Sequence, residues 1–316
     1  RHGVGGVVGS VGSWGFARGG VGSVSSALAS SLRAVGGEIR TNAEVVSISV
    51  KRGRATGVVL ASGEELSARA VISNLDAKRT FLGLLDSCDL PDDLVRRARN
   101  FKIRGSSGKV NIALDGMPEF PALPKGSPLT LGHMHFTDTL ERLERAYDDW
   151  KDDRWSQDPY VDMVIPTQYD PSMSPPGKHM MSVFVQYCPV EAEGGWTDSK
   201  RDAFGAAVIN KIADYSPNFK DLLLHAEIRT PRELEAEVGL TEGNIFQGEL
   251  TLDQLMFNRP FPGYAQYRAP IKNMYMCSSS NHPGGGVMGA PGANSAREVL
   301  IDFGRSSTTP EDFGDD

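Results

Sequence analysis

A short apolar segment, a glycine-rich loop and a helix-like segment follow one another near the end of the sequence, and this stretch restricts the fold most. The tetrapeptide from Met274 to Cys277 is apolar and short, which is typical of a buried strand. Beyond the loop, apolar residues recur at helical spacing at Ala293, Ala296, Val299, Leu300 and Phe303. Pro291 lies near the first helical turn, where its missing N–H is harmless and its fixed φ favours helix initiation. The stretch therefore predicts a strand, a loop and a helix over residues 293–303.

The loop between these two elements, residues 283–292, has the composition of an anion-binding site, and it is called the glycine loop below. A helix start gathers unpaired N–H groups and a partial positive charge. Glycines without side chains let a ligand approach this backbone closely, which suits a phosphate or another electron-rich group. The alternative is a turn that only lets a helix pack on a sheet. Three consecutive glycines beside His282 and Pro283 exceed what such packing requires.

The glycine loop also has the G-x-G-x-x-G spacing of the dinucleotide-binding fingerprint, at Gly284, Gly286 and Gly289. We reject NAD binding because that fingerprint belongs to a first βαβ unit, with a second strand and an acidic ribose partner about 20 residues later. Here the predicted helix ends near Phe303 and a polar tail follows. The glycine loop is therefore expected to hold only part of a cofactor.

The composition is that of a soluble globular protein with enough apolar residues for a large core. The 316 residues are 40% hydrophobic, and their number is compatible with two domains. The net charge is -7 and no long run of Lys or Arg occurs, so nucleic acid and an anionic membrane surface are not expected as partners. No apolar run approaches the roughly 18 residues of a membrane-spanning helix.

Cysteine usage and the beginning of the sequence bear on localisation. Cys88, Cys188 and Cys277 are odd in number and far apart, which is typical of reduced thiols and excludes a CxxC pair or a thiolate zinc site within this chain. We therefore expect a reducing compartment, the cytoplasm or, in a eukaryote, the mitochondrial matrix. Residues 3–22 are rich in glycine but are not a signal peptide by pattern, because Gly and Ser interrupt the apolar residues. Since the sequence begins with Arg1, we expect it to start inside a longer protein.

Residues 21–35 predict a helix that begins at a second junction between glycines and apolar residues. The apolar positions fall three and four residues apart and form one stripe, and Gly36 and Gly37 close the helix. The start of this helix would face a ligand or would simply pack closely against a neighbour, and the pattern does not choose between the two.

Three strands are predicted after this helix, over residues 45–50, 55–60 and 65–72. The last strand ends at Ser73 and Asn74, and small polar residues at the carboxyl end of a strand are well placed to line a ligand crevice. Asn74 is therefore a candidate ligand-binding residue, with helix capping as the alternative.

The middle of the chain alternates predicted strands with predicted helices. Strands are expected at residues 107–114, 161–166 and 179–187, and helices near residues 81–85, from Pro91, and at residues 139–153 and 198–215. Two further segments have the form of a capping box, and they begin at Thr230 and at Thr251, so each predicts the start of a helix.

The sequence contains no self-sufficient set of catalytic residues. Neither G-x-S-x-G nor H-E-x-x-H occurs. His133 and His135 would share one face of a strand, but no acidic or His partner stands near them in sequence, so no metal site is assigned. His282 precedes the glycine loop and is a candidate for contact with a cofactor or substrate, or for capping the loop's own backbone. Redox chemistry would thus depend on a cofactor that the protein positions.

Several motifs together resemble the flavin-dependent oxidoreductases of the phytoene desaturase and amine oxidase superfamily, and the resemblance covers nearly the whole chain. The motifs are WG at 14–15, GGVG at 19–22, AVISN at 70–74, PPG at 175–177, GNIF at 243–246, LDQL at 252–255, RP at 259–260 and HPGGGVMGA at 282–290. The resemblance implies an α/β fold of mixed α+β character. It comprises a partial, Rossmann-like FAD-binding domain assembled from separated segments and a substrate domain built on a mixed sheet.

The resemblance also implies where FAD would be held. The glycine loop and its helix would lie beside the ribityl, pyrophosphate and ring portions of FAD, and Val45 would contact the adenine end through its backbone. The candidate cofactor-binding residues are Val45, Asn74, His282, Gly284, Gly285, Gly286, Val287, Met288, Gly289 and Ala290. No catalytic residue and no metal ligand is assigned.

Five segments follow from this assignment of domains. They are an inter-domain segment and helix at 1–35, a FAD-domain segment at 36–85, a substrate domain at 86–270, the returning FAD-domain strand, loop and helix at 271–304, and a disordered tail at 305–316.

The amino-terminal strand of the superfamily, its G-x-G-x-x-G turn and its acidic ribose-binding residue are absent from these 316 residues. The chain therefore resembles the carboxyl-terminal part of a longer enzyme. We expect a FAD-dependent dehydrogenase, desaturase or oxidase that acts on a small apolar substrate, with FAD bound weakly or not at all by this chain alone. The alternative is a flavin-free interaction protein that retains the fold. A homo-oligomer or a protein partner is compatible with both hypotheses.

Overall fold

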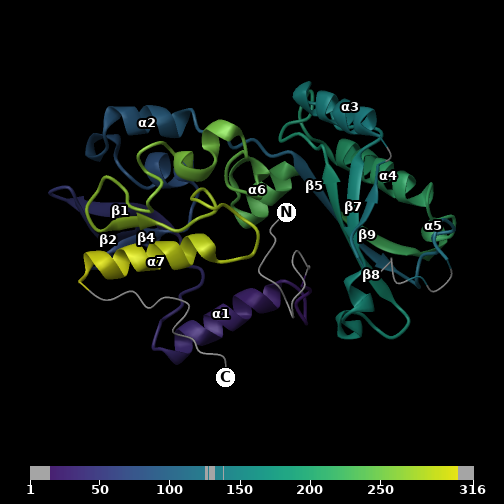
Figure 1. The fold of residues 1–316 in the computed structure, drawn as a ribbon, viewed down its shortest axis with the longest axis horizontal. Helices are drawn as coiled ribbons and strands as arrows, with labels where there is room; N and C mark the ends of the chain where they lie inside the picture. Colours follow the sequence, from purple (N-terminus) through teal and green to yellow (C-terminus); the bar gives the residue numbers. More distant parts are fainter. Residues whose placement is uncertain (1–14, 125–126, 128–131, 138, 305–316) are drawn as a thin grey trace. The chain divides into compact units, whose positions relative to one another are not determined.

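The computed structural model describes residues 15–124, 127, 132–137 and 139–304, and the chain divides into two compact units (Figure 1). The first unit comprises residues 1–39 and 105–243, and the second comprises residues 40–104 and 244–316. Residues 86–104 and 244–270, which the sequence analysis assigned to a substrate domain, fall in the second unit. The predicted tail at 305–316 lies outside the described residues.

A five-stranded antiparallel sheet forms the centre of the first unit, with the strand order β6-β7-β8-β5-β9. Its strands are β5 (Ser107–Leu114), β6 (Met134–Phe136), β7 (Tyr160–Val164), β8 (His179–Gln186) and β9 (Leu223–Arg229). Three of these strands agree with the predicted ones, whereas β6 and β9 were not predicted. The helices of this unit are α1 (Gly22–Ala34), α3 (Leu140–Lys151), α4 (Asp198–Ala213), α5 (Phe219–Leu222) and α6 (Pro231–Val238).

One face of this sheet carries the core of the first unit, because residues of β5 alternate between buried and partly exposed positions. Val110 and Ile112 point into a cluster that also contains Phe204 and Val208 of α4. Close packing depends on glycine here, since a Cβ at Gly108 would lie 2.5 Å from the Phe204 ring. The opposite face of the sheet carries both polar and apolar side chains, among them Lys109, Asp162 and Phe184.

Two small sheets form the strands of the second unit. β1 (Val45–Lys51), β2 (Arg54–Leu60) and β3 (Glu65–Ser67) pair antiparallel, and β4 (Val71–Ser73) pairs parallel with β10 (Met274–Met276). The prediction of one strand over residues 65–72 is wrong, because the chain leaves the first sheet after Ser67 and enters the second at Val71. A local pattern does not reveal this change of sheet, since both halves alternate in the same way.

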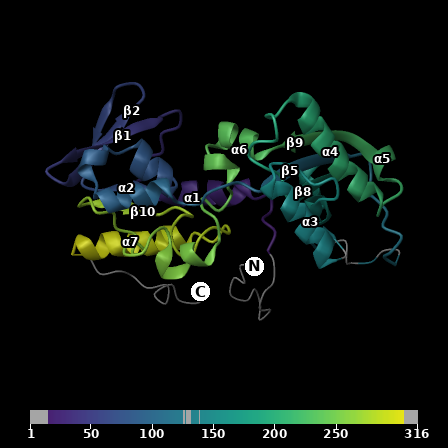
Figure 2. The same cartoon turned by 90° about the horizontal axis from the view of Figure 1, so that it is seen from above.

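Helices α2 (Asp92–Arg99) and α7 (Ala290–Asp302) belong to the second unit (Figure 1). Figure 2 shows β10 between the two helices, with β1 and β2 on the other side of α2. Phe81, Leu94 and Phe101 lie in the core cluster together with Met274 and Met276 of β10. The residues around Phe81 form a short π-helical turn, where a short helix was predicted.

The two predicted capping boxes have different outcomes. At Thr230 the side chain accepts the N–H of Glu233 and the Glu233 side chain accepts the N–H of Thr230, so α6 begins with a complete capping box. The prediction at Thr251 is wrong, because only a three-residue 3-10 turn follows and the Thr251 side chain makes no cap. Gln254, which would close this box, instead bonds the backbone N–H and carbonyl of Lys102.

The apolar stripes of two predicted helices are not buried in the described structure. α1 follows the predicted helix closely but contains no buried residue, and Val21 and Leu28 are each 65% exposed. In α7 the buried residues are Pro291 and Ser295, whereas Ala293 and Ala296 are exposed. Helical periodicity therefore predicted these two helices correctly, but it did not predict which of their residues are buried.

No helix within the described residues has both the length and the apolar character that crossing a bilayer requires.

The difference between the two capping sequences can be measured. Thr230→Ala removes a complete cap and should lower the free energy of unfolding by about 1 kcal/mol. Thr251→Ala is the matched control, and it should change this free energy by less than about 0.5 kcal/mol. Denaturant unfolding followed by circular dichroism measures both values, and equal losses would contradict the assignment.

Candidate functional site

The parallel pair β4 and β10 determines where the candidate residues meet. Met276 pairs with Ser73, and the N–H of Cys277 donates to the Ser73 carbonyl at 2.9 Å. Since both strands run in the same direction, Asn74 and the segment leading to the glycine loop leave the sheet at the same edge. The structure thus brings together two candidate segments that are about 200 residues apart in sequence.

Helix α7 begins at the end of the glycine loop, with Gly289 as its N-cap residue at a φ of 65°. It starts at Ala290, three residues before the predicted position, and Pro291 lies in the first turn as expected. The first turn contains no acidic residue. A Cβ added at Gly289 or Gly292 would meet no atom within 4 Å. The backbone at the start of the helix is therefore accessible to a ligand.

Within the glycine loop, the backbone adopts conformations that favour glycine. Gly284 and Gly286 have φ values of 101° and 132°. Val287 has a φ of 56° although it is β-branched, and its side chain is 72% exposed. Such a conformation is strained and is found mainly at functional sites. Met288 and Ala290, the remaining candidates in this segment, are both partly exposed.

Arg259 holds the backbone beside the glycine loop in place. Its side chain is fully buried, and its Nε donates to the carbonyl of Ser279 at 2.9 Å. A Cβ added at Gly284 would lie 3.6 Å from this Nε. The sequence analysis included Arg259 only as part of a family motif and gave it no role.

Two buried polar atoms next to the glycine loop have no hydrogen-bond partner among the described residues. They are Asn281 Nδ2, which precedes the loop, and Ser295 Oγ, in the second turn of α7, and each residue is 1% exposed. Buried polar groups are nearly always hydrogen-bonded, so these two indicate positions for ligand or water atoms. Together with the accessible helix start, they fit a polar, anionic group such as the phosphate portion of a nucleotide.

His282 is exposed, and its backbone carbonyl is connected to α7 by hydrogen bonds through the Tyr267 hydroxyl. The His282 carbonyl accepts a hydrogen bond from the Tyr267 hydroxyl at 2.7 Å, and Asn294 Nδ2 donates to the same hydroxyl. The imidazole remains accessible, so contact with a cofactor or substrate stays a prediction.

Asn74 and Val45, the two candidates outside the glycine loop, lie in different sheets. Asn74 is exposed at the carboxyl end of β4. It does not cap the following turn, because the N–H of Arg79 donates to Asp76 instead. Val45 is half-buried at the start of β1, where it pairs with Leu60 of β2. The structure therefore joins Asn74 with the glycine loop and leaves Val45 in the antiparallel sheet.

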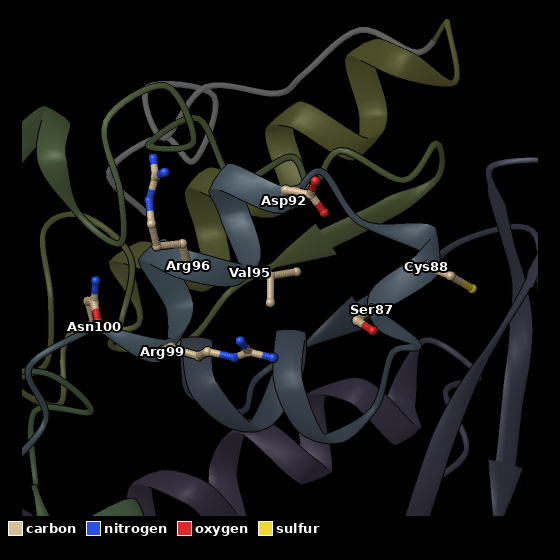
Figure 3. Close-up of a pocket in the computed structure, with 7 residues that line it drawn as sticks. All are labelled: Ser87, Cys88, Asp92, Val95, Arg96, Arg99 and Asn100. Carbon is tan, nitrogen blue, oxygen red and sulfur yellow. The ribbon is translucent and has the colours of Figure 1, made fainter.

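A cavity of the second unit lies apart from this site. It has a volume of about 460 Å³ and is lined by Ser87, Cys88, Asp92, Val95, Arg96, Arg99 and Asn100. Figure 3 shows that the guanidinium groups of Arg96 and Arg99 point in different directions, so they do not converge on one ligand atom. The glycine loop contributes nothing to its lining. The glycine loop is therefore preferred over this cavity as the candidate ligand-binding site.

A polar network occupies the face of the five-stranded sheet opposite its core, and sequence analysis did not find it. The His133 Nδ1 lies 2.8 Å from Asp162 Oδ1, and the His135 Nδ1 lies 3.7 Å from Asp162 Oδ2. Lys109 of β5 donates to the Ser182 hydroxyl of β8. Burial lowers the pKa of Lys109 to about 8, against the opposing effect of Asp162. Lys109 can therefore exist as a neutral amine at mildly alkaline pH.

Asp162 is the acidic partner that His133 and His135 lacked in sequence, because strand pairing places it opposite His135. No group of three or more His, Cys, Asp or Glu in the described part of the chain is arranged to hold a metal ion. Asp162 is hydrogen-bonded to His133, whereas the His135 Nδ1 lies 2.5 Å from the Tyr160 hydroxyl oxygen. Near His133, the rings of Phe16 and Tyr169 stack with their centroids 4.2 Å apart. Trp14 lies outside the described residues.

Residues 5–293 match the flavin containing amine oxidoreductase family. The chain is 39% identical over 313 residues to pyridine nucleotide-disulfide oxidoreductase domain-containing protein 2 of Mus musculus, covering 96% of this chain and 54% of that protein. It is 27% identical to phytoene desaturase (lycopene-forming) of Paracoccus sp., covering 90% and 55%. A solved structure of a putrescine oxidase variant superposes with a TM-score of 0.55 at 16% identity, covering 91% and 53%.

The likeness to the putrescine oxidase variant supports the predicted fold class, a mixed arrangement of helices and sheets. At such low sequence identity it carries no information beyond the fold. The chain spans about half the length of the curated relatives it matches.

The ionisation of Lys109 can be tested directly. We expect its amine to titrate with a pKa of about 8, and Asp162→Asn should lower this pKa further because the carboxylate favours the charged form. Competitive acetylation at a series of pH values, read by mass spectrometry, measures this titration, with exposed lysines of the same digest as references. A Lys109 pKa that Asp162→Asn leaves unchanged would contradict the proposed coupling.

Proposed function

Because this chain belongs to the flavin containing amine oxidoreductase family, we propose that it is the carboxyl-terminal part of a FAD-dependent oxidoreductase. The predicted superfamily is thereby confirmed, and a flavin is the cofactor of the family. The observation that carries the proposal for this chain is the accessible start of α7 beside two buried polar atoms without partners. An idle scaffold would have no need of such a site.

The residues that would hold FAD are those of the glycine loop and its surroundings. Backbone N–H groups from Gly286 to Ala290 are suited to the phosphate and ribityl portions, and Asn281 offers a side-chain donor. Asn74 would line the same crevice, because β4 ends beside β10. Val45 would contact the adenine end through its backbone, as the family resemblance implies. When bound, FAD would supply the acceptor of a hydride or of electrons from a C–H or C–N bond.

The five-stranded sheet of the first unit would form the substrate side. The proposed substrate is a small apolar molecule, and one relative is by its name a desaturase of phytoene. Lys109 lies on this sheet, and in its neutral form it is a candidate proton acceptor, because burial lowers its pKa to about 8. The carboxylate of Asp162 orients His133, and the Tyr160 hydroxyl, 2.5 Å from the His135 Nδ1, orients His135.

We further propose that this chain alone binds FAD weakly or not at all, because the amino-terminal nucleotide motif of the superfamily is absent from these residues. The alternative function is that of a flavin-free interaction protein with the same fold. The two proposals differ in one measurement. Co-expression with the preceding amino-terminal part of the full-length enzyme should give a protein that retains flavin absorbance after desalting and is bleached by its substrate. A colourless complex would favour the interaction protein, and strong flavin absorbance from this chain alone would refute weak binding.

Gly292→Leu tests the glycine loop as the cofactor site. The substitution fills the open space at the first turn of α7 without forcing a left-handed backbone, so it should leave folding intact and reduce the flavin content of the full-length protein at least about tenfold. Ala296→Leu, at an exposed position one turn further from the loop, is the matched control and should retain flavin. Flavin absorbance per mole of protein after desalting measures the difference. Equal retention by both variants would mean that the loop does not contact the cofactor.

A further inference from the structure

Arg259 is a buried cation without an acidic partner among the described residues. It lies between the 3-10 turns near residue 255 and the returning strand β10, and its side chain is 0% exposed. Its five N–H protons are directed at backbone carbonyls, those of Phe246, Gly248, Glu249, Gln254 and Ser279. Burial lowers the pKa of Arg259 to about 10, so the guanidinium remains charged at neutral pH.

Two other cations among the described residues, the buried Lys211 and the partly buried Arg268, have carboxylate partners. Lys211 donates to Asp158, and Arg268 binds Glu298 and Asp302 at the end of α7. Removing a charge from water is costly unless an opposite charge compensates for it. A neutral side chain would avoid this cost, so hydrogen bonding to carbonyls alone does not account for an arginine at this position.

The charge of Arg259 lies directly behind the glycine loop. A Cβ at Gly284 would be 3.6 Å from its Nε, and the helix that follows presents the positive end of its dipole at Gly289. The first turn of α7 holds no acidic residue to oppose this field. A fixed charge and a helix dipole of the same sign therefore act on one backbone segment, which is buried at Gly284 and exposed at Gly286 and Gly289.

We propose that Arg259 is the built-in cation of an anion-binding site at the glycine loop, and that an anionic group of the bound ligand serves as its counter-charge. Arg259 acts through the field and through the backbone it holds, so it is a positioning residue. Asn281 Nδ2, buried beside the loop without a partner, is an independent indication of a ligand there. The inference rests on the proposed function in that the natural anion would be a phosphate of FAD.

The test uses this chain and inorganic sulfate, and it does not depend on flavin binding. Chemical shifts of the glycine-loop amides, from Gly284 to Gly289, are followed by nuclear magnetic resonance during a sulfate titration at constant ionic strength. The wild-type chain should show saturable shifts. Arg259→Met should weaken sulfate binding at least about fivefold, because it removes a unit charge from a poorly solvated position. Arg259→Lys keeps the charge and should bind within about twofold of wild type, although it loses hydrogen bonds.

Arg268→Met is the matched control, because it removes an arginine of the same unit whose charge is already compensated. It should leave sulfate affinity unchanged. If Arg259→Met and wild type bind sulfate with equal affinity, the proposed role of the charge is wrong, whereas the glycine loop remains an anion-binding site. If Arg259→Lys folds but binds sulfate much more weakly than wild type, Arg259 acts by holding the backbone and not through its charge. This comparison tests the role of the charge even if Arg259→Met does not fold. No saturable shift in the wild-type chain would instead count against the glycine loop as an anion site, and so against the proposed function.

Discussion

The parallel pairing of β4 with β10 is the constraint on which the second unit depends. These two strands are about 200 residues apart in sequence, yet three consecutive pairs join them, from Met274 with Val71 to Met276 with Ser73. The pairing brings the end of one segment, at Asn74, beside the beginning of the other, at Cys277. Because ligands of α/β proteins bind beyond the carboxyl ends of parallel strands, one pairing defines both the core and the candidate site.

Local sequence patterns predicted most elements and the glycine loop, because these depend on neighbours in the chain. The strand Ser107–Leu114, the helix after residue 21 and the capping box at Thr230 follow from spacing alone. The network of Lys109, Asp162 and His135 could not be predicted in this way. It depends on the register of four strands, β6, β7, β8 and β5, and pairing partners are set by the whole sheet.

The errors of sequence analysis have a common physical cause. The segment 65–72 was assigned to one strand, and Thr251 was assigned a helix cap, because each matches a local rule. In both cases a distant segment provides a stronger interaction. Lys102 engages the Gln254 side chain that the capping box required, and β10 pairs with the second half of the assumed strand. Tertiary contacts therefore override local preference where a segment has more than one possible partner.

Charge is distributed differently in the two units, and this difference is the strongest argument that redox chemistry here would depend on a cofactor. In the second unit Arg259 stays protonated at neutral pH because its pKa, although lowered, remains near 10. It can only attract an anion. In the first unit Lys109, with a pKa near 8, can gain or lose a proton under physiological conditions. One group suits the binding of a phosphate and the other suits proton transfer, yet neither can accept electrons. In the proposed function the described residues would provide binding and proton transfer, and the oxidation itself would require a group such as a flavin.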